Sequence, residues 1–544
     1  MNLVTDPWLP VTNSKNQLCY ISLNQLFEQP DEWLDLVLRP HERVSVMRFL
    51  ICLVQAALDG PEEENDWDDA IEIIPEYTLE YLKHWRKNFY IFEDDIPESE
   101  ENISPFLQIR SLKPGNDTTS GPSITKLDSS LAVGENASTL FDHGAACEIT
   151  GYSIDREMTD SQIIISLITF LNYSPSGTQS SAKLGGVLIK HNSGATDSPC
   201  VNQNMLHTFV VKRSLVRTIH ANLIDKETCE DFFGKNSWGK PVWEIAEPKS
   251  IDDEQAKQNA VVTYLGRLVP LSRFCKLKKE SKYFVYCKGF EYSTKPKKKT
   301  DSKKVYRDFL PEPSTTIILS SENDYSVLKA GNNVPWREIS ALTAKRSKGT
   351  EGGALPLKFL SRGESLDIIV LGQIRDPENV AKVLDLVESK VHIPAFMLDS
   401  RNRQVYEANI KLCDQKSYQL FKAIEKYRAS VDDDWKKILK RFSERETRPS
   451  DRKARDIFRK KATHYYWTLI EKQRHLLMQY ISLLGTESDQ AREESKKAWL
   501  NAINSAVDET YRTLCNQDSP RQLRAYVTGW QILHPSKSEH QEAA

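Results

Sequence analysis

Closely spaced cysteines are absent from this sequence. Nine cysteines are scattered over 544 residues, no two form a CxxC pair, and their number is odd. Zinc ribbons and disulfide frameworks require cysteines at short, repeated spacings, so the sequence predicts neither. Scattered free thiols are typical of proteins in a reducing compartment, and we therefore expect the chain to be cytoplasmic.

Long hydrophobic runs are also absent. The N-terminal residues MNLVTDPWLPV have neither the basic region nor the apolar region of a signal peptide. The longest apolar stretches, such as 163–171, fall well short of the roughly 20 residues that a transmembrane helix needs. Hydrophobic residues make up 39% and charged residues 27%, a composition typical of soluble proteins. We expect no membrane contact and roughly two to four domains.

The chain has little net charge and none of the common catalytic motifs. Its formal net charge is -3, whereas a nucleic-acid-binding module is usually basic overall. No GxxxxGK[ST] loop, HExxH motif or GxSxG elbow occurs. The histidines are dispersed, and we interpret His207 and His220 as structural. The sequence thus predicts no metal, no cofactor and no catalytic residue, and any contact with nucleic acid must come from local basic surfaces.

The first 376 residues mix helix-like and strand-like patterns. A stretch rich in serine and glycine, 174–199, predicts a long exposed loop. Helices are predicted at 43–59, 159–172 and 205–223, with strands within 261–319 and a final strand at 366–371. We therefore expect an α+β globular domain over residues 1–376.

After residue 376 proline becomes rare and helical periodicity prevails. Helices are predicted at 377–391, 403–429, 432–445, 450–484, 489–516 and 519–532. Four of these are long and are joined by short connections, which favours an antiparallel four-helix bundle. The predicted second domain is this all-α bundle, residues 377–544.

Two segments are locally basic. Segment 276–308 carries twelve Lys or Arg against four acids, and segment 436–475 carries fourteen against five. The acidic runs 62–69 and 93–101 would repel a phosphate backbone, so we expect neither to face DNA. Composition alone favours a solubilising role for the lysine runs and a mobile insert for the serine-glycine stretch.

Six sequence segments, taken in order, change this interpretation. They are NLVTDPWLPV at 2–11, WRKNFYIFEDDIP with PFLQI at 85–109, NASTLFDH at 136–143, GKPVWE at 239–244, PWREISAL at 335–342 and GQIRDPENVAKVLDLVESKVHIP at 372–394. In this order, over about residues 1–400, they resemble the CasA family, the large subunit of the type I-E CRISPR surveillance complex Cascade. Some relatives carry a zinc site made by cysteine pairs, which this sequence lacks.

The resemblance implies a binding protein without catalytic activity. It would recognise the protospacer-adjacent motif in double-stranded DNA and help open the duplex for pairing with guide RNA, giving an R-loop. Implied partners are target DNA, crRNA, the other Cascade subunits and a helicase-nuclease recruited later. Two alternatives remain open: a purely structural scaffold, and a nuclease with an unrecognised metal site.

The resemblance also implies contacts with the minor groove. Two neighbouring groups are candidates for the family's glycine loop: Gly177, Thr178 and Gln179, or Lys183, Gly185 and Gly186. A family lysine follows a strand that resembles GRLVPLSRF, which makes candidates of Arg273, Lys276, Lys278 and Lys279. The alternative for these residues is ordinary surface charge.

The hinge at 372–394 departs from the family pattern. In relatives a glutamine there wedges the first base pair apart. Alignment on Arg375 puts Glu378 at that position, alignment on Ala381 puts Val380 there, and Asn379 can contact a base edge in either case. An inserted aliphatic side chain unstacks base steps in other minor-groove binders. The alternative is that this stretch only begins the first helix of the bundle.

The resemblance implies two further groups of candidate residues. NASTLFDH resembles a segment that contacts the crRNA end, which makes candidates of Asn136 and Phe141, although they also suit a simple turn. Contacts between the basic helices and a DNA strand are assigned to Lys436, Lys437, Lys440, Arg452, Arg455, Arg459 and Lys460. A solvated helix face is an equal alternative for any one of these.

Overall fold

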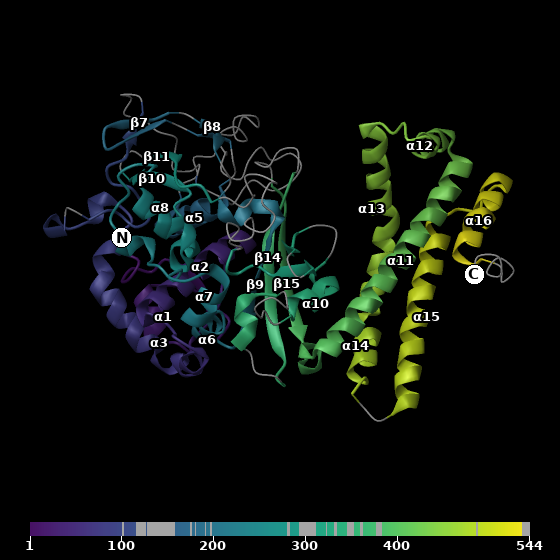
Figure 1. The fold of residues 1–544 in the computed structure, drawn as a ribbon, viewed down its shortest axis with the longest axis horizontal. Helices are drawn as coiled ribbons and strands as arrows, with labels where there is room; N and C mark the ends of the chain where they lie inside the picture. Colours follow the sequence, from purple (N-terminus) through teal and green to yellow (C-terminus); the bar gives the residue numbers. More distant parts are fainter. Residues whose placement is uncertain are drawn as a thin grey trace. The chain divides into compact units, whose positions relative to one another are not determined.

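The chain forms two units, Met1–Ala395 and Phe396–Ala544 (Figure 1). The computed structural model describes residues 1–100, 103–115, 127, 158–174, 177–179, 181–190, 192–195, 198–279, 283–292, 312–321, 324–330, 334–344, 353–359, 363–376, 383–485 and 488–535. For 177–179 and 192–195 this description covers the backbone only. Within these residues unit 1 combines helices with small sheets, and unit 2 is helical.

Unit 1 is built around helix α2 (Pro40–Leu58). A proline suits the first helical position because the N–H it lacks has no partner there. Glu42 closes the same end by accepting the Arg39 N–H at 3.0 Å. Every side chain from Val44 to Gln55 is buried, which confirms the buried helix predicted at 43–59.

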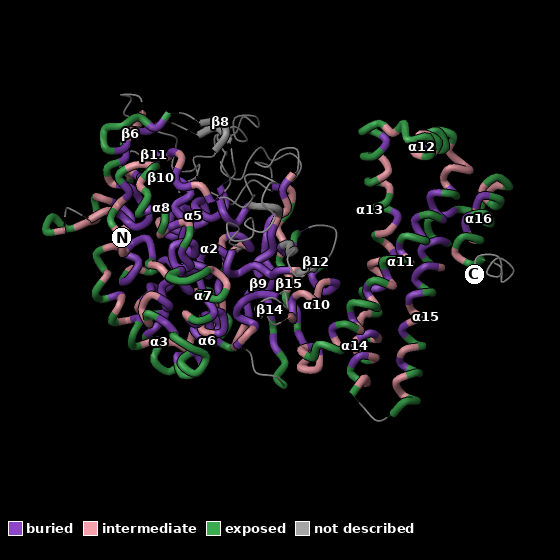
Figure 2. Tube along the Cα trace, viewed as in Figure 1, coloured by how far each residue is buried: buried purple, intermediate pink, exposed green. Residues whose placement is uncertain are grey.

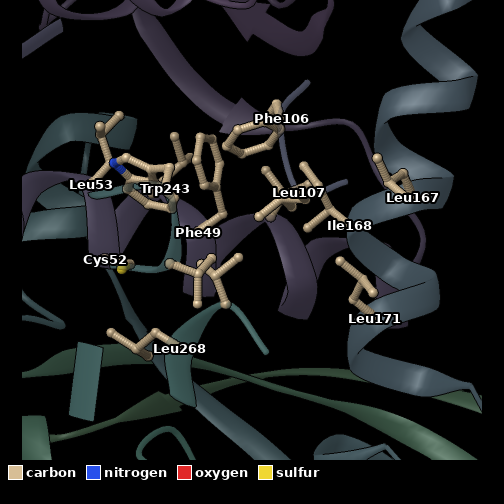
Figure 3. Packing of buried hydrophobic residues seen from close by; sticks show 14 of the residues in the cluster. Phe49, Cys52, Leu53, Phe106, Leu107, Leu167, Ile168, Leu171, Trp243 and Leu268 are labelled. Carbon is tan, nitrogen blue, oxygen red and sulfur yellow. The ribbon is translucent and has the colours of Figure 1, made fainter. Parts of the chain in front are cut away.

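Elements from many parts of the chain contact α2. They include α3 (Glu64–Trp85), which follows it directly, and the more distant α5 (Asp160–Tyr173), α6 (Leu215–His220), α9 (Tyr264–Leu268) and β14 (Leu366–Arg375). Figure 3 shows Phe49 of α2 among these layers, with its ring 5.4 Å from Phe106 and 5.7 Å from Trp243. The hydrophobic core is thus continuous around this helix, as the buried tube of Figure 2 also shows.

A three-stranded antiparallel sheet covers one side of this core. Its order is β15–β14–β9, with β9 at Leu206–Val211 and β15 at Val383–Ile393. Strand β14 is buried along most of its length, so the strand predicted at 366–371 is confirmed but is not the last one. The chain divides after Ala395, later than the predicted boundary at 376, because β15 belongs to this sheet.

Two predicted helices are therefore wrong. Segment 205–223 begins as β9 before α6, and segment 377–391 is β15 over its described part. Both segments have apolar spacings that also suit a helix. However, β9 and β15 each pair with an edge of β14. These backbone hydrogen bonds, which for β9 reach a strand far away in sequence, override local helical preference.

The predicted loop at 174–199 is also wrong, because it contains four short strands. They are β5 (Gly177–Gln179), β6 (Ala182–Leu184), β7 (Val187–Ile189) and β8 (Asn192–Ala195). Gly185 and Gly186 have φ angles of 56° and 85°, the pattern of a two-residue turn that matches strand twist. β6 and β7 pair across this turn as a hairpin, and β4 (Lys113–Pro114) extends it.

The remaining elements of unit 1 lie around this framework. They are β1 (Leu9–Asn13), β2 (Leu18–Ile21), α1 (Leu23–Glu28), β3 (Trp33–Leu36), α7 (Lys226–Phe233), α8 (Glu254–Val262), β10 (Arg273–Lys278), β11 (Tyr283–Lys288), β12 (Ile317–Ser321), β13 (Asp324–Val327) and α10 (Ile339–Leu342). The helix predicted at 159–172 is confirmed as α5, and the strands expected within 261–319 are confirmed from β10 onward.

Unit 2 consists of helices that closely follow the periodicity of the sequence. They are α11 (Ser400–Val431), α12 (Asp433–Ser443), α13 (Pro449–Lys472), α14 (Arg474–Ser482), α15 (Asp489–Leu514) and α16 (Pro520–Leu533). The helix predicted at 450–484 breaks at Gln473 into α13 and α14. Helix α11 contacts all the others. At Gly529 of α16 a Cβ atom would lie 2.1 Å from the Tyr511 hydroxyl, so this close approach requires glycine.

A buried ion triad joins three segments inside unit 1. Arg48 of α2 pairs with Glu312 at 2.8 Å, and Arg267 of α9 pairs with the other carboxylate oxygen. The side chains of Arg48 and Glu312 are fully buried. Arg48 also donates to the Leu268 carbonyl at 3.3 Å. Since burying a charge is costly unless it is paired, each member of the triad depends on the others.

We predict a large loss of stability when Glu312 is replaced by alanine. The E312A substitution leaves two buried guanidinium groups without their carboxylate, which costs about 3–5 kcal/mol of the free energy of unfolding. Urea denaturation followed by tryptophan fluorescence measures this. The matched control E254A removes the exposed pair with Lys257 and should leave stability nearly unchanged. Equal stability of the two variants would contradict the prediction.

Candidate nucleic-acid interface

The end of α5 and the end of β14 are joined by Arg375. Its guanidinium donates to the Tyr173 carbonyl at 2.6 Å and to the Gln373 side chain at 3.1 Å. Its backbone N–H donates to the Asn204 side chain at 3.1 Å. Arg375 is only 4% exposed. The two segments predicted to read DNA, one following α5 and one following β14, therefore start from the same place.

Neutral aromatic groups lie around this junction. The ring of Tyr173 is 6.0 Å from that of His41 and 6.2 Å from that of His207. Burial, followed by the positive charges of Arg39 and Arg375, lowers the pKa of His41 to about 3. Burial and the Arg48 charge hold the pKa of His207 well below its usual value. Both imidazoles are uncharged near neutral pH, so they add no positive charge beside Arg375.

The histidines of the sequence prediction have structural surroundings. His207 Nδ1 lies 2.8 Å from the Ser314 hydroxyl, which links β9 to the segment before β12. His220 Nε2 lies 2.7 Å from the Trp67 carbonyl, and its ring stacks on that indole. These contacts support the interpretation of both residues as structural.

The first candidate for the glycine loop forms part of a strand. Gly177 pairs with Ala195 and Gln179 pairs with Asn192, so Gly177, Thr178 and Gln179 belong to a hairpin formed by β5 and β8. This stretch directly follows the Tyr173 carbonyl that Arg375 binds. Its backbone is therefore attached to the junction at one end and held by β8 along its length.

The second candidate is the hairpin of β6 and β7. Lys183 lies in β6, and Gly185 and Gly186 are its exposed turn. A Cβ atom at Gly186 would meet nothing within 4 Å. The positive φ angles, rather than a close neighbour in the protein, explain why glycine stands at both positions.

The basic residues of β10 are neutralised by the acidic run that follows Phe92. Arg273 is 2% exposed and donates to the Ser272 carbonyl at 2.7 Å. Lys276 and Lys278 pair with Glu93 at 2.8 and 3.3 Å. Burial alone would raise the pKa of Glu93, but hydrogen bonds from Lys276, Arg110 and Lys278 lower it to about 2. Glu93 thus stays ionised well into the acidic range.

Lys279 is the more exposed member of this group. Its ammonium lies 3.8 Å from Asp95 and 3.6 Å from Asp160, and 4.7 Å from the centre of the Phe92 ring. Three of the four candidates lie in β10 and Lys279 follows it directly. Arg273 is enclosed in the core, whereas the three lysines face carboxylates.

The basic residues of unit 2 divide into paired and unpaired groups. Arg455 forms a bidentate pair with Glu425 at 2.6 and 2.8 Å. The other pairs are Lys437 with Asp434 at 2.9 Å and Lys440 with Glu444 at 3.6 Å. Arg452 donates to the Thr447 hydroxyl at 3.4 Å, and Arg459 lies 6.0 Å from the Tyr418 ring. Lys436 and Lys460 are exposed and make no ion pair within the described residues.

Five candidates cannot be placed. Glu378, Asn379 and Val380 of the hinge, and Asn136 and Phe141 of the crRNA segment, lie outside the described residues. A residue missed from sequence is Tyr173, whose carbonyl joins the two segments. The Gly-Gly pair was the available signal for the β6–β7 hairpin.

A cavity of about 840 Å³ lies apart from this junction, between segments 103–113 and 242–248. Its floor includes Phe106 and Trp243, which also pack in the core. Glu247 on its wall accepts the backbone N–H groups of Arg110 and Ser111 at 3.0 and 3.1 Å. These contacts hold the surrounding loops together, and the candidate Lys276 and its partner Glu93 also line this cavity.

The described residues contain no group of three or more His, Cys, Asp or Glu side chains arranged to hold a metal ion. No helix in the same part of the chain is long and apolar enough to cross a membrane.

Comparison with known proteins identifies similar folds. The sequence matches the model of the family CRISPR-associated protein Cse1 over residues 2–510. CasA from Thermus thermophilus has a TM-score of 0.68 at 17% identity, with 98% of each chain covered. Cse1 from Thermobifida fusca has a TM-score of 0.71 at 16% identity, covering 100% of this chain and 99% of that one. A CRISPR RNA-guided surveillance complex contains a chain with a TM-score of 0.66 at 16% identity, covering 98% and 99%. A search of curated proteins found no match.

We predict that the R375M substitution loosens both segments at the junction. Methionine fills a similar volume but cannot donate to the Tyr173 carbonyl, so hydrogen exchange of the backbone amides at 177–179 and 374–376 should become at least about tenfold faster. Mass spectrometry of exchanged peptides measures this.

The R403M variant is the matched control, because Arg403 is also buried and donates to a carbonyl, that of Leu398, in unit 2. R403M should leave exchange at 177–179 unchanged. Unchanged exchange there in R375M as well would show that Arg375 does not hold the segment.

Proposed function

The chain belongs to the CRISPR-associated protein Cse1 family, and from this premise we propose that it is the large, non-catalytic subunit of a type I-E Cascade complex. Its partners would be crRNA and the other Cascade subunits. The observation that carries the proposal is the family match over residues 2–510. The similarity in fold to a chain of an RNA-guided surveillance complex, over 98% of this sequence, is in agreement.

Within such a complex we propose that unit 1 recognises the protospacer-adjacent motif in duplex DNA. Support comes from the Arg375 junction, which brings the start of the segment after β14 to the end of α5. The strand Gly177–Gln179 would approach the minor groove with its backbone. Asn379 would contact a base edge, and Glu378 or Val380 would separate the first base pair. Asn136 and Phe141 would contact the crRNA end.

To contact DNA, the β10 lysines would have to exchange their carboxylate partner for a phosphate group. Lys276 and Lys278 share the Glu93 carboxylate, and a phosphate group approaching them has to compete with it. Contact with DNA at this place is therefore weaker than the lysine count indicates. Lys279 is the most exposed of the three lysines, and we assign it the larger share of the contact with DNA. Arg273, which is buried, would act through the strand rather than by direct contact.

We propose that unit 2 corresponds to a four-helix bundle in which α13 and α14 count as one broken helix. Its unpaired cations on α12 and α13 would hold a DNA strand through its phosphates. Recruitment of a helicase-nuclease after R-loop formation is part of the same proposal. If the protein is only a scaffold, its removal leaves motif discrimination intact. If it is a nuclease, the purified chain cleaves DNA with Mg²⁺.

We expect the assembled complex to prefer motif-bearing duplex only when this subunit is present. Electrophoretic mobility shifts with motif-bearing and scrambled duplexes, with and without the subunit, measure the preference. It should be at least about tenfold with the subunit, because one lost base contact typically costs about 1–3 kcal/mol. Equal affinity in all four combinations would remove the motif-reading proposal, and cleavage by the chain alone would replace it with the nuclease.

Salt dependence tests the role of unit 2. Each phosphate contact contributes about -0.9 to the slope of log affinity against log salt concentration. The K436A/K460A variant should therefore flatten that slope by about 1–2. The matched variant K437A/K440A removes cations that already pair with Asp434 and Glu444, and should flatten it less. The same slope in wild type and K436A/K460A would exclude these lysines as phosphate contacts.

A further inference from the structure

Two lysines of β10 are bound to one carboxylate. Glu93 Oε2 lies 2.8 Å from the ammonium nitrogen of Lys276 and 3.3 Å from that of Lys278. Residues i and i+2 of a strand point to the same face, which is why both side chains reach the same acid. The Lys278 side chain is 36% exposed, so another anion in the solvent can approach it. The ion pair of Lys278 with Glu93 is therefore open to competition.

A second carboxylate of the same short turn, Glu93–Asp95, binds the next lysine. Asp95 lies 3.8 Å from the ammonium nitrogen of Lys279, which Asp160 also approaches at 3.6 Å. Asp94, between the two binding acids, is exposed and makes no ion pair within the described residues. This acidic turn thus presents alternate carboxylates to the lysines, as a nucleic-acid strand presents successive phosphates.

Lys278 can leave the carboxylate without exposing its neighbours to an unpaired charge. Arg110 Nε donates to the other oxygen of Glu93 at 3.0 Å. Lys276 keeps its pair with Glu93 and also donates to the Arg110 carbonyl at 2.7 Å. The penalty for a buried, unpaired charge therefore does not arise when Lys278 changes partner. Lys278 is the lysine through which we expect exchange to take place.

Two expectations from the sequence meet at this turn. The β10 lysines are candidates for contact with DNA, whereas the acidic run 93–101 is expected to face away from DNA because it repels phosphate. The ion pairs bring a member of each group into contact. Both expectations hold together only if the acidic turn gives up a lysine when DNA binds.

We propose that the acidic turn is an internal competitor of DNA, which occupies the β10 lysines as a phosphate backbone would and lowers the affinity of the protein for duplexes in general. Non-specific binding depends almost wholly on contacts between cations and phosphates, so a competitor at those cations acts on it directly. A genome offers a large excess of non-specific duplex, and a lower affinity for it leaves more of the protein free to search. The inference rests on the proposed function and adds to it the regulation of the lysine contact.

The test measures the affinity of the complete complex for a scrambled duplex over a range of salt concentrations. E93Q keeps a side chain of the same length that still accepts hydrogen bonds, but removes its charge. It should bind about tenfold more tightly at low salt and steepen the slope of log affinity against log salt concentration by about 1, because a released lysine adds one phosphate contact. In the K278A background the same substitution should tighten binding less than about twofold, since the lysine that it frees is missing.

The matched control is D94N. It removes the same charge one residue away, from a side chain that holds no lysine, and therefore reports the long-range effect of net charge, which salt screens. We expect it to change the affinity less than about twofold and to leave the slope unchanged. Equal affinities and slopes of E93Q and D94N would overturn the proposal, and so would an undiminished gain from E93Q in the K278A background.

A second variant keeps the test decisive if E93Q lowers the melting temperature or fails to join the complex. D95N acts through Lys279 and should tighten binding to the scrambled duplex about threefold, less than E93Q because Asp160 remains beside that lysine. Unchanged binding by D95N would then show that the ion pairs only hold the protein together. The proposed function fails separately, if the complex without this chain keeps its preference for motif-bearing duplex.

Discussion

The burial of every side chain of α2 from Val44 to Gln55 is the constraint on which the rest of unit 1 depends. A helix with no solvent-facing side needs partners in every direction, and here they come from α3, α5, α9 and β14. Arg48 then has to find its counter-charge inside the protein, which it does at Glu312. That pair ties the segment before β12 to the core, and Arg267 adds α9 to the same carboxylate. The scaffold that presents both segments proposed to read DNA is assembled around this one helix.

Many charged side chains in this chain form ion pairs with residues far away in the sequence. The lysines of β10 and the acids near Glu93 are about 180 residues apart in sequence, yet they form one cluster. In unit 2, Arg455 is held by Glu425 and is flanked by the Phe442 ring at 4.7 Å. Such contacts leave only part of each basic run free to attract phosphate. They explain how a nearly neutral protein can present a positive surface at selected points.

The helices of unit 2, the buried α2 and α5 were predictable because their apolar spacing is local information. β9 and β15 were not, since their backbone hydrogen bonds are completed by another strand, β14, which for β9 is far away in sequence. The hairpins in 174–199 were hidden by a composition that usually indicates a loop. Among the candidate residues, sequence located the β10 lysines together but could not anticipate that Glu93 binds them. Arg375 served only as an alignment point, because nothing local shows that its guanidinium reaches Tyr173.

The Arg375 junction distinguishes the residues whose hydrogen bonds fix the two segments from the residues that make none of these bonds. The hydrogen bonds to Tyr173, Gln373 and Asn204 fix where the two segments leave the protein, and none of them involves the residues farther along. Substitutions of residues beyond the junction that make none of these hydrogen bonds therefore leave them in place. If the proposed function holds, such an arrangement would let lineages in an arms race with invading genomes alter what is recognised through a few mutations, without first having to evolve a new scaffold.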